Sequence, residues 1–224
     1  GDKLTEYRYK PKTDLIIAKI VSVGGHIRQR YGYTYDADAL LVEEVADDGN
    51  SPDMALLDGV TERRYTKKTP KKTAPAYGFA ERVETGYFDL QQQRDVPLQT
   101  TAYTYDERCR IIQEDIYDAN GDYRYSLTRT YDAHGNVTSE TDALGILSEY
   151  RYDESDNKIY AMDWHTQVET AYVYDFANRV IQTHEKHSEG DILVTKYRYD
   201  YLGNKIAEVS PQGHETRYVY DNLS

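Results

Sequence analysis

The strongest potential nucleophile in this sequence is its single cysteine, Cys109. It lies between Arg108 and Arg110, and nearby cations favour the nucleophilic thiolate. A thiol enzyme also needs a base and a group that orients that base. The nearest histidine in the sequence is His134, and no flanking motif matches a known thiol enzyme. We therefore favour a structural role for Cys109 over catalysis.

Two histidines and a series of aspartates are the candidates for metal binding. His184 and His187 are three residues apart, so on a strand they point to opposite faces, and no cysteine or third histidine lies near them. Carboxylates gathered at one edge of a sheet could bind Ca²⁺. Each aspartate has a sufficient role in closing a turn, however, and neighbouring ones are expected ~10 Å apart. We expect no metal and no cofactor.

A basic run is the main anomaly of charge in this acidic chain. It could contact an acidic partner, a sulfated polysaccharide or an acidic part of the same parent protein. We favour a solvated loop. The tyrosines could also stack on sugars, but packing within a sheet already explains them, so carbohydrate binding is the weaker interpretation. The run consists of Arg63, Arg64, Lys67, Lys68, Lys71 and Lys72.

The composition predicts a wide sheet without a thick aliphatic core. The 224 residues include 24 tyrosines, against three phenylalanines and one tryptophan, and only 39% are hydrophobic. Tyrosine favours strands and carries a polar tip, so it suits a sheet that is wet on one face. Helical signals are weak throughout the sequence.

Charge and chain ends limit the partners and the context. A net charge of −12 argues against nucleic acid or an anionic membrane as the main partner. There is no run of ~18 apolar residues, so we expect no membrane span. The sequence begins with glycine and stops just after a repeated motif, which indicates a piece of a longer protein. Asn136 and Asn222 each begin a glycosylation pattern, which matters only in a eukaryotic secretory host.

A repeated Tyr-x-Tyr-Asp motif organises the chain. From Asp132 onward the motif aspartates recur at intervals of 21 to 25 residues. Residues 147–167 illustrate one unit, in which an alternating strand, a short polar turn and a second alternating strand form a β-hairpin. Isolated hairpins are marginally stable in water, so the units must pair into an extended sheet. We also expect the rings of adjacent tyrosine doublets to stack across strands.

Each turn starts with an aspartate, because its side chain can accept hydrogen bonds from backbone N–H groups further along the turn. These turn aspartates are Asp36, Asp106, Asp118, Asp132, Asp153, Asp175, Asp200 and Asp221. The fourth turn position is expected to have positive φ, which glycine, asparagine and aspartate tolerate. Gly121, Gly135, Asp156, Asn178 and Gly203 meet that demand, whereas Ala39 and Cys109 are exceptions.

We interpret residues 1–224 as one all-β segment, an extended, curved antiparallel sheet of consecutive β-hairpins. Residues 1–46 contain degenerate repeats and residues 102–224 regular ones. Residues 47–101 break the period and are interpreted as an insertion with a basic loop and a hairpin. We expect this insertion to stay within the sheet and to cover an edge or an end.

The motifs "YRYDYLGNKIAE" and "RTYDAHGNVTSE" resemble the YD repeats of the Rhs family, clearly across 102–221 and more weakly across 4–45. Members of this family include bacterial polymorphic toxins, insecticidal toxin complexes and teneurins. The resemblance implies a β-sheet that coils into a hollow shell around a C-terminal toxic domain. The family's self-cleaving core sequence and a toxin domain are both missing from this sequence, so neither activity is carried over.

The resemblance therefore implies a non-enzymatic shell segment of a secreted or surface-exposed, bacterial protein. Its expected partners are the remaining repeats of the parent shell and an enclosed C-terminal cargo domain. The alternative that we keep is a carbohydrate-binding or adhesion module built from the same repeats, with glycans as partners.

Overall fold

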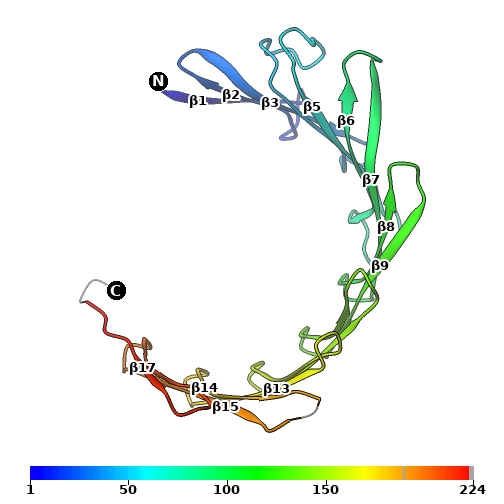
Figure 1. Ribbon diagram of the computed structural model, residues 1–224. Coiled ribbons are helices and arrows are strands. Elements are labelled where there is room, and N and C mark those ends of the chain that lie inside the picture. Colours follow the sequence, from blue (N-terminus) through cyan, green and yellow to red (C-terminus); the bar gives the residue numbers. More distant parts are fainter. Residues whose placement is uncertain (189, 222–224) are drawn as a thin grey trace. The chain divides into compact units, whose positions relative to one another are not determined.

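The computed structural model describes residues 1–188 and 190–221, so Asn222 lies outside the described residues. These described residues are all-β, as predicted: they form a 17-stranded antiparallel sheet of consecutive hairpins (Figure 1). The chain divides into two compact units, Gly1–Ser126 and Leu127–Ser224. The described residues contain no helix that could cross a membrane.

In the first unit each strand pairs with the next one along the chain, and Figure 1 shows these strands side by side on a gently bending surface. The strands are β1 (Lys3–Tyr9), β2 (Ile16–Val23), β3 (His26–Tyr35), β4 (Leu41–Asp47), β5 (Arg63–Pro70), β6 (Ala80–Asp89), β7 (Arg94–Tyr105) and β8 (Ile111–Asp118).

The second unit continues the same pattern with shorter strands, again paired in chain order. β9 (Tyr123–Tyr131) begins before the boundary between the units. The others are β10 (Val137–Thr141), β11 (Leu147–Tyr152), β12 (Lys158–Asp163), β13 (Val168–Tyr174), β14 (Val180–Lys186), β15 (Leu193–Tyr199), β16 (Lys205–Val209) and β17 (Glu215–Arg217).

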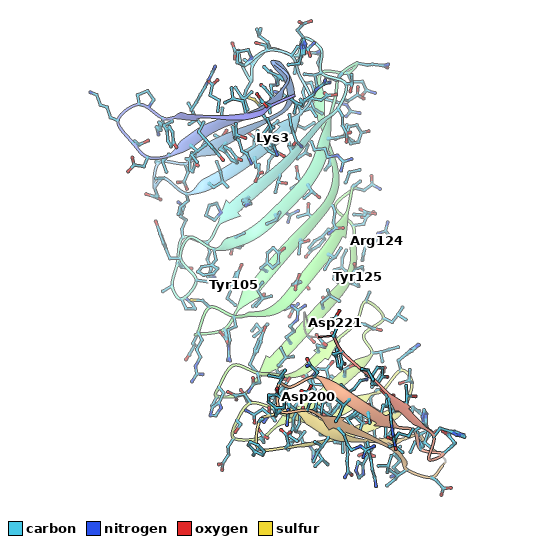
Figure 2. The ribbon with its side chains drawn as sticks, turned by 90° about the vertical axis from the view of Figure 1, so that its left-hand side faces the viewer. Lys3, Tyr105, Arg124, Tyr125, Asp200 and Asp221 are labelled. Atoms are coloured by element: carbon cyan, nitrogen blue, oxygen red, sulfur yellow. The ribbon has the colours of Figure 1, made fainter. Side chains whose placement is uncertain are left out.

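Because the strands alternate in direction, the turns of each unit fall at two opposite ends of its strands. We call the end that holds the turns after odd-numbered strands the odd rim, and the other end the even rim. Figure 2 shows Tyr105 and Arg124 at opposite ends of the strands of the first unit. Asp118 ends β8 and therefore lies at the even rim, whereas Asp36 and Asp106 begin turns at the odd rim.

The sheet is a single layer with little core. The chain exposes 14745 Å², whereas a compact protein of this mass exposes about 10,500 Å². The six buried side chains that we count as core are Ala18, Ile20, Tyr65, Ala76, Ile116 and Ala207. Both faces thus stay partly wet, where we had expected one wet face. Paired backbone and polar side chains must supply much of the stability.

Residues 47–101 supply β5, β6 and most of β7, which stand between β4 and β8. The segment therefore continues the sheet and does not cover an edge. We had expected the basic run to be a solvated loop, but part of it lies in strand β5. The Arg, Tyr, Thr and Lys residues of this segment pair with β4. Lys67, for example, lies opposite Glu43, which favours this register by cross-strand charge pairing.

Candidate functional site

The turn after β11 shows how an aspartate closes a hairpin. The backbone N–H of Asp153 donates to the carbonyl of Asn157 (3.0 Å), and that of Asp156 donates back to the carbonyl of Asp153 (3.1 Å). The Oδ1 of Asp153 accepts the backbone N–H groups of Ser155 and Asn157, both at 2.9 Å. One carboxylate oxygen therefore satisfies two amides that strand pairing leaves free.

The same arrangement is present at seven of the eight predicted turns. In each, Oδ1 of the first residue accepts two backbone N–H groups of its own turn, at Asp36, Asp106, Asp118, Asp132, Asp153, Asp175 and Asp200. The turn that follows Asp221 extends into residues outside the described part.

The fourth residue of all seven turns has positive φ, from 59° to 106°. Glycine tolerates this conformation at Gly121, Gly135 and Gly203, and Asp156 and Asn178 tolerate it better than most side chains. Ala39 (61°) and Cys109 (62°) adopt it as well. These two exceptions keep the turn geometry and accept its strain.

The turn carboxylates are held in their ionised form. The pKa values of all seven lie below the usual 3.8. At Asp153 the side-chain amide of Asn157 lowers the pKa most, followed by the backbone N–H of the same residue. At Asp175 the Arg179 guanidinium is the main cause of the lowered pKa. The carboxylates therefore act as fixed hydrogen-bond acceptors.

The fifth turn residue joins neighbouring turns of the second unit, and we call these contacts rungs. Asn136 Nδ2 donates to Oδ2 of its own Asp132 (3.1 Å) and to Oδ1 of Asp156 in the next turn (2.7 Å). His134 Nδ1 also lies 2.8 Å from Asp156 Oδ1, and this contact raises the pKa of the imidazole. Two turns that are far apart in sequence thus share one carboxylate.

Two more rungs follow. Asn157 Nδ2 lies 3.0 Å from Oδ1 of Asn178 in the next turn, and Arg179 Nη1 donates to the carbonyl of Asp200 at 3.0 Å. The rungs were not predicted from the sequence. The signal was the recurrence of Asn or Arg directly after the positive-φ residue, at Asn136, Asn157, Arg179 and Asn204.

In five of the seven doublets, the second tyrosine makes a contact that phenylalanine cannot make. Its hydroxyl donates to the backbone carbonyl of the first residue of the preceding strand, at 2.7 to 2.9 Å. The pairs are Tyr35 with Ile16, Tyr105 with Ala80, Tyr174 with Lys158, Tyr199 with Val180, and Tyr220 with Lys205. This contact requires tyrosine, and not phenylalanine, at these five positions.

The expected stacking of adjacent doublets was wrong for the second unit. Doublets sit on odd strands, so two strand spacings, ~10 Å, separate their rings, beyond the ~7 Å reach of ring pairs. The rings instead lie near cations at the start of the intervening strand or directly before it: Lys158 Nζ lies 3.9 Å from the Tyr150 ring centroid, and Arg179 Cζ lies 4.9 Å from that of Tyr199. The Tyr150 hydroxyl also donates to Glu140 at 2.7 Å. Burial, then this bond, raises the pKa of Tyr150 to about 12.

A buried ionic centre holds the loop 48–62 in the first unit. The Arg30 side chain is fully buried, and its Nε donates to Asp47 Oδ1 at 2.5 Å. Its Nη groups donate to the carbonyls of Ser51, Asp53 and Leu56 at 2.6, 2.8 and 3.1 Å. Sequence reasoning missed this centre, because its donors and acceptors come from segments far apart in the sequence.

Most of the basic run is neutralised inside the first unit. Arg63 Nε donates to Asp47 Oδ2 (2.9 Å), Arg64 pairs with Glu62, and Lys67 Nζ donates to Asp95 (2.6 Å). Lys72 Nζ donates to Asp36 at 2.5 Å and to Asp38 at 2.6 Å. Lys68 and Lys71 make no ion pair with another described residue. Because these ion pairs leave fewer free cations for a sulfated glycan, the basic run gives less support to the glycan-binding alternative.

Residues 71–79, which we call the strap, join two turns of the odd rim. Lys72 binds the turn that begins at Asp36, and the carbonyl of Pro75 accepts the Cys109 thiol at 3.2 Å in the turn that begins at Asp106. Ala76 in the strap is fully buried, and Phe79 packs edge-on against Tyr105 with ring centroids 5.6 Å apart. Cys109 therefore has a hydrogen-bonding partner and no catalytic one in the described structure.

Other sequence candidates are not brought together. His184 Nε2 lies 3.0 Å from Gln182 Oε1, and the described residues contain no group of three His, Cys, Asp or Glu placed to hold a metal ion. One further aspartate turn was not predicted from the sequence. Asp142 Oδ1 accepts the N–H groups of Leu144 and Ile146 at 2.8 and 2.9 Å. Because threonine and not tyrosine precedes Asp142, this turn does not match the Tyr-Asp motif.

Comparison with known proteins agrees with the repeat. The RHS Repeat family model matches residues 131–159, which confirms the Rhs/YD-repeat resemblance in that stretch. No curated protein matches this chain.

Three solved structures are similar at low identity. TcdB2-TccC3-Cdc42 is 14% identical with a TM-score of 0.40, over 93% of this chain and 13% of that one. A protein of unknown function from Bacteroides fragilis NCTC 9343 is 11% identical with a TM-score of 0.33, over 55% and 86%. TcdB2-TccC3 without its hypervariable C-terminal region is 14% identical with a TM-score of 0.32, over 96% and 14%. This chain thus spans about one seventh of the TcdB2-TccC3 structures.

Proposed function

We propose that this chain is a structural, non-enzymatic segment of a β-shell that encapsulates a toxin or effector cargo. The parent would be a secreted or surface-exposed Rhs-type protein, bacterial in origin. The partners are the remaining repeats of the parent shell and an enclosed C-terminal cargo domain. This chain would contribute part of the shell wall, which is held together by the hydrogen bonds of the turns and rungs.

The observation that carries this proposal is the single-layer sheet with both faces partly wet. An enzyme scaffold buries one side of its sheet to build a core and a cleft, whereas a wall must face water, or a cargo, on each side. Hydrogen bonds that the turn aspartates accept from backbone N–H groups, and those that the tyrosine hydroxyls donate to backbone carbonyls, replace the missing core. The RHS repeat at residues 131–159 supports the same reading.

Limited proteolysis of the natural protein that carries this chain tests the proposal. With the shell intact under native conditions, we expect a domain C-terminal to the repeats to resist proteinase K, while a flexible peptide tag on the outside is removed. After denaturation, the same domain should be digested. Rapid native digestion of that domain while the repeats stay intact would overturn encapsulation.

A further inference from the structure

One rung of the second unit contains a histidine. His134 occupies the third position of the turn that begins at Asp132, and its Nδ1 lies 2.8 Å from Oδ1 of Asp156 in the next turn of the odd rim. Asn136 Nδ2 donates to the same oxygen at 2.7 Å. Two side chains of one turn therefore converge on one carboxylate oxygen of another, and one of the two titrates near neutral pH.

Asp156 accepts this rung from a backbone conformation that favours glycine. It is the fourth residue of its turn and has a φ of 61°, whereas glycine stands at that position in the turn that begins at Asp132. The turn itself does not need a carboxylate there, because Asp153 already accepts the backbone amides. The contacts with His134 and Asn136 give the Asp156 side chain a role outside its own turn.

The contact between His134 and Asp156 requires a proton on Nδ1, because a carboxylate can only accept a hydrogen bond. An imidazolium always carries that proton, whereas neutral imidazole has a single proton that divides between Nδ1 and Nε2. Protonation also places a positive charge beside the carboxylate, which strengthens the hydrogen bond. Loss of the proton therefore weakens this contact and leaves the Asn136 bond as the remaining tie.

We propose that His134 makes the rung between these two turns a pH-dependent tie, which is strong when the imidazole is protonated and weak when it is neutral. The next rung along the rim provides an internal comparison. There Asn157 Nδ2 lies 3.0 Å from Asn178 Oδ1, and neither amide titrates. The second unit therefore places a pH-dependent rung next to a pH-independent one.

The other ionisable groups of the two turns favour the charged imidazole. All of them are carboxyl groups, which belong to Asp132, Asp153, Glu154 and Asp156. The hydrogen bond to Asp156 raises the pKa of His134 most, and the charge of Asp132 adds to this rise. The pKa of Asp156 is lowered, chiefly by Asn136 and next by His134, so its carboxylate stays ionised while the imidazole titrates.

The raised pKa of His134 sets the pH window of the response. Because this folded pKa lies above the ordinary 6.5, the folded state binds the proton more tightly than the unfolded state does. The stabilisation is complete below pH 6.5 and is lost as pH rises through the folded value. The side chains of His134 and Asp156 are 59% and 51% exposed, so solvent screens the pair and its effect stays local.

An NMR titration of the full chain tests the source of the response. We expect a higher pKa for the His134 imidazole in the wild type than in Asp156→Asn, which lacks the charge. Asparagine suits this position, because Asn178 has a φ of 59° at the corresponding position of the next turn. The variant also keeps an amide oxygen that can accept the Asn136 bond. Equal pKa values of His134 in the two proteins would overturn the proposal.

Hydrogen exchange between about pH 6 and about pH 9 measures the tie itself. After correction for intrinsic exchange rates, the protection of the Asp156 and Asn157 amides should fall about two- to fivefold as pH rises. The amides of Ala177 and Arg179, in the turn beyond the pH-independent rung, should keep their protection over the same range.

Two glutamine variants separate the rung from general effects of pH. His134→Gln keeps a side-chain N–H that can donate to Asp156 but does not titrate, so the fall in protection should disappear. His165→Gln, in a turn of the even rim, is the matched control and should show the same fall as the wild type. A wild type without the fall overturns the proposal, as does a fall of equal size in His134→Gln.

Discussion

The two units join the turns of their odd rims in different ways. In the second unit, side chains of the turns that begin at Asp132, Asp153 and Asp175 reach the next turn of the odd rim, as Asn157 does toward Asn178. In the first unit, the strap replaces a turn between those of Asp36 and Asp106, and binds both through Lys72 and the Cys109 thiol. The two residues that break the turn rule, Ala39 and Cys109, lie in the two turns that the strap joins.

This difference shows that the repeat needs more than closed hairpins. A single-layer sheet has few buried contacts to hold one hairpin against the next, so neighbouring turns must be tied together at the rim. Where the repeat is regular, the fifth turn residue provides the tie. Where an insertion changes the spacing, the inserted chain provides it, and the first unit adds a buried ionic centre at Arg30.

Acid should have the largest effect, because all seven turn aspartates of both units respond together. Their folded pKa values lie below 3.8, so the folded state holds fewer protons than the unfolded state, and the stabilisation is complete above pH 3.8 and lost as pH falls through the folded values. Urea unfolding at stepped pH should show stability that falls steeply below about pH 4. Unchanged stability down to about pH 2 would contradict the role of the carboxylates.

Among the single substitutions, Arg30→Ala should produce the largest difference in hydrogen exchange between the two units. It leaves Asp47 without one of its two cations and three loop carbonyls without a donor, at a cost of about 3–5 kcal/mol. We expect hydrogen exchange to rise across the first unit and to stay unchanged in β11 to β16. Arg28→Ala, an exposed neighbour on the same strand, is the control and should cost little.

Tyr174→Phe tests the hydroxyl contact in the second unit. It removes the 2.8 Å bond to the Lys158 carbonyl and keeps the ring, so we expect a loss of about 1 kcal/mol in the free energy of unfolding. Tyr172→Phe, the first tyrosine of the same doublet, should cost less. Equal losses for the two variants would mean that packing, and not the second hydroxyl, makes tyrosine necessary.

Cys109→Gly should have the smallest effect on stability, because two changes oppose each other. Glycine relieves the strain of φ 62°, and the strap loses the thiol bond to Pro75, so the net change should stay within about 1 kcal/mol. The amide of Gly78 in the strap should nevertheless exchange faster. Cys109→Ser keeps a hydrogen-bond donor, so the Gly78 amide should stay protected in that variant. Identical exchange of Gly78 in the two variants would exclude a stabilising bond between residue 109 and the strap.

The sequence was sufficient to predict the hairpins, because alternation and Tyr-Asp spacing are local signals. The rungs, the strap and the Arg30 centre depend on which distant segments become neighbours. Asn136 and Asp156 are 20 residues apart in the chain and meet only when the hairpins pair. The expected ring stacking failed for a related reason, since the strand between two doublets separates their rings.

Hydrogen exchange of the second unit in Asn157→Ala tests the central claim, that rungs tie neighbouring turns into one wall. The substitution removes the bond to Asn178, so the amides of Ala177 and Arg179 in the next turn should exchange about fivefold faster. Asn204→Ala, which removes only the bond to its own Asp200 among the described residues, should leave those amides unchanged. Unchanged exchange at Ala177 and Arg179 in Asn157→Ala would contradict the claim.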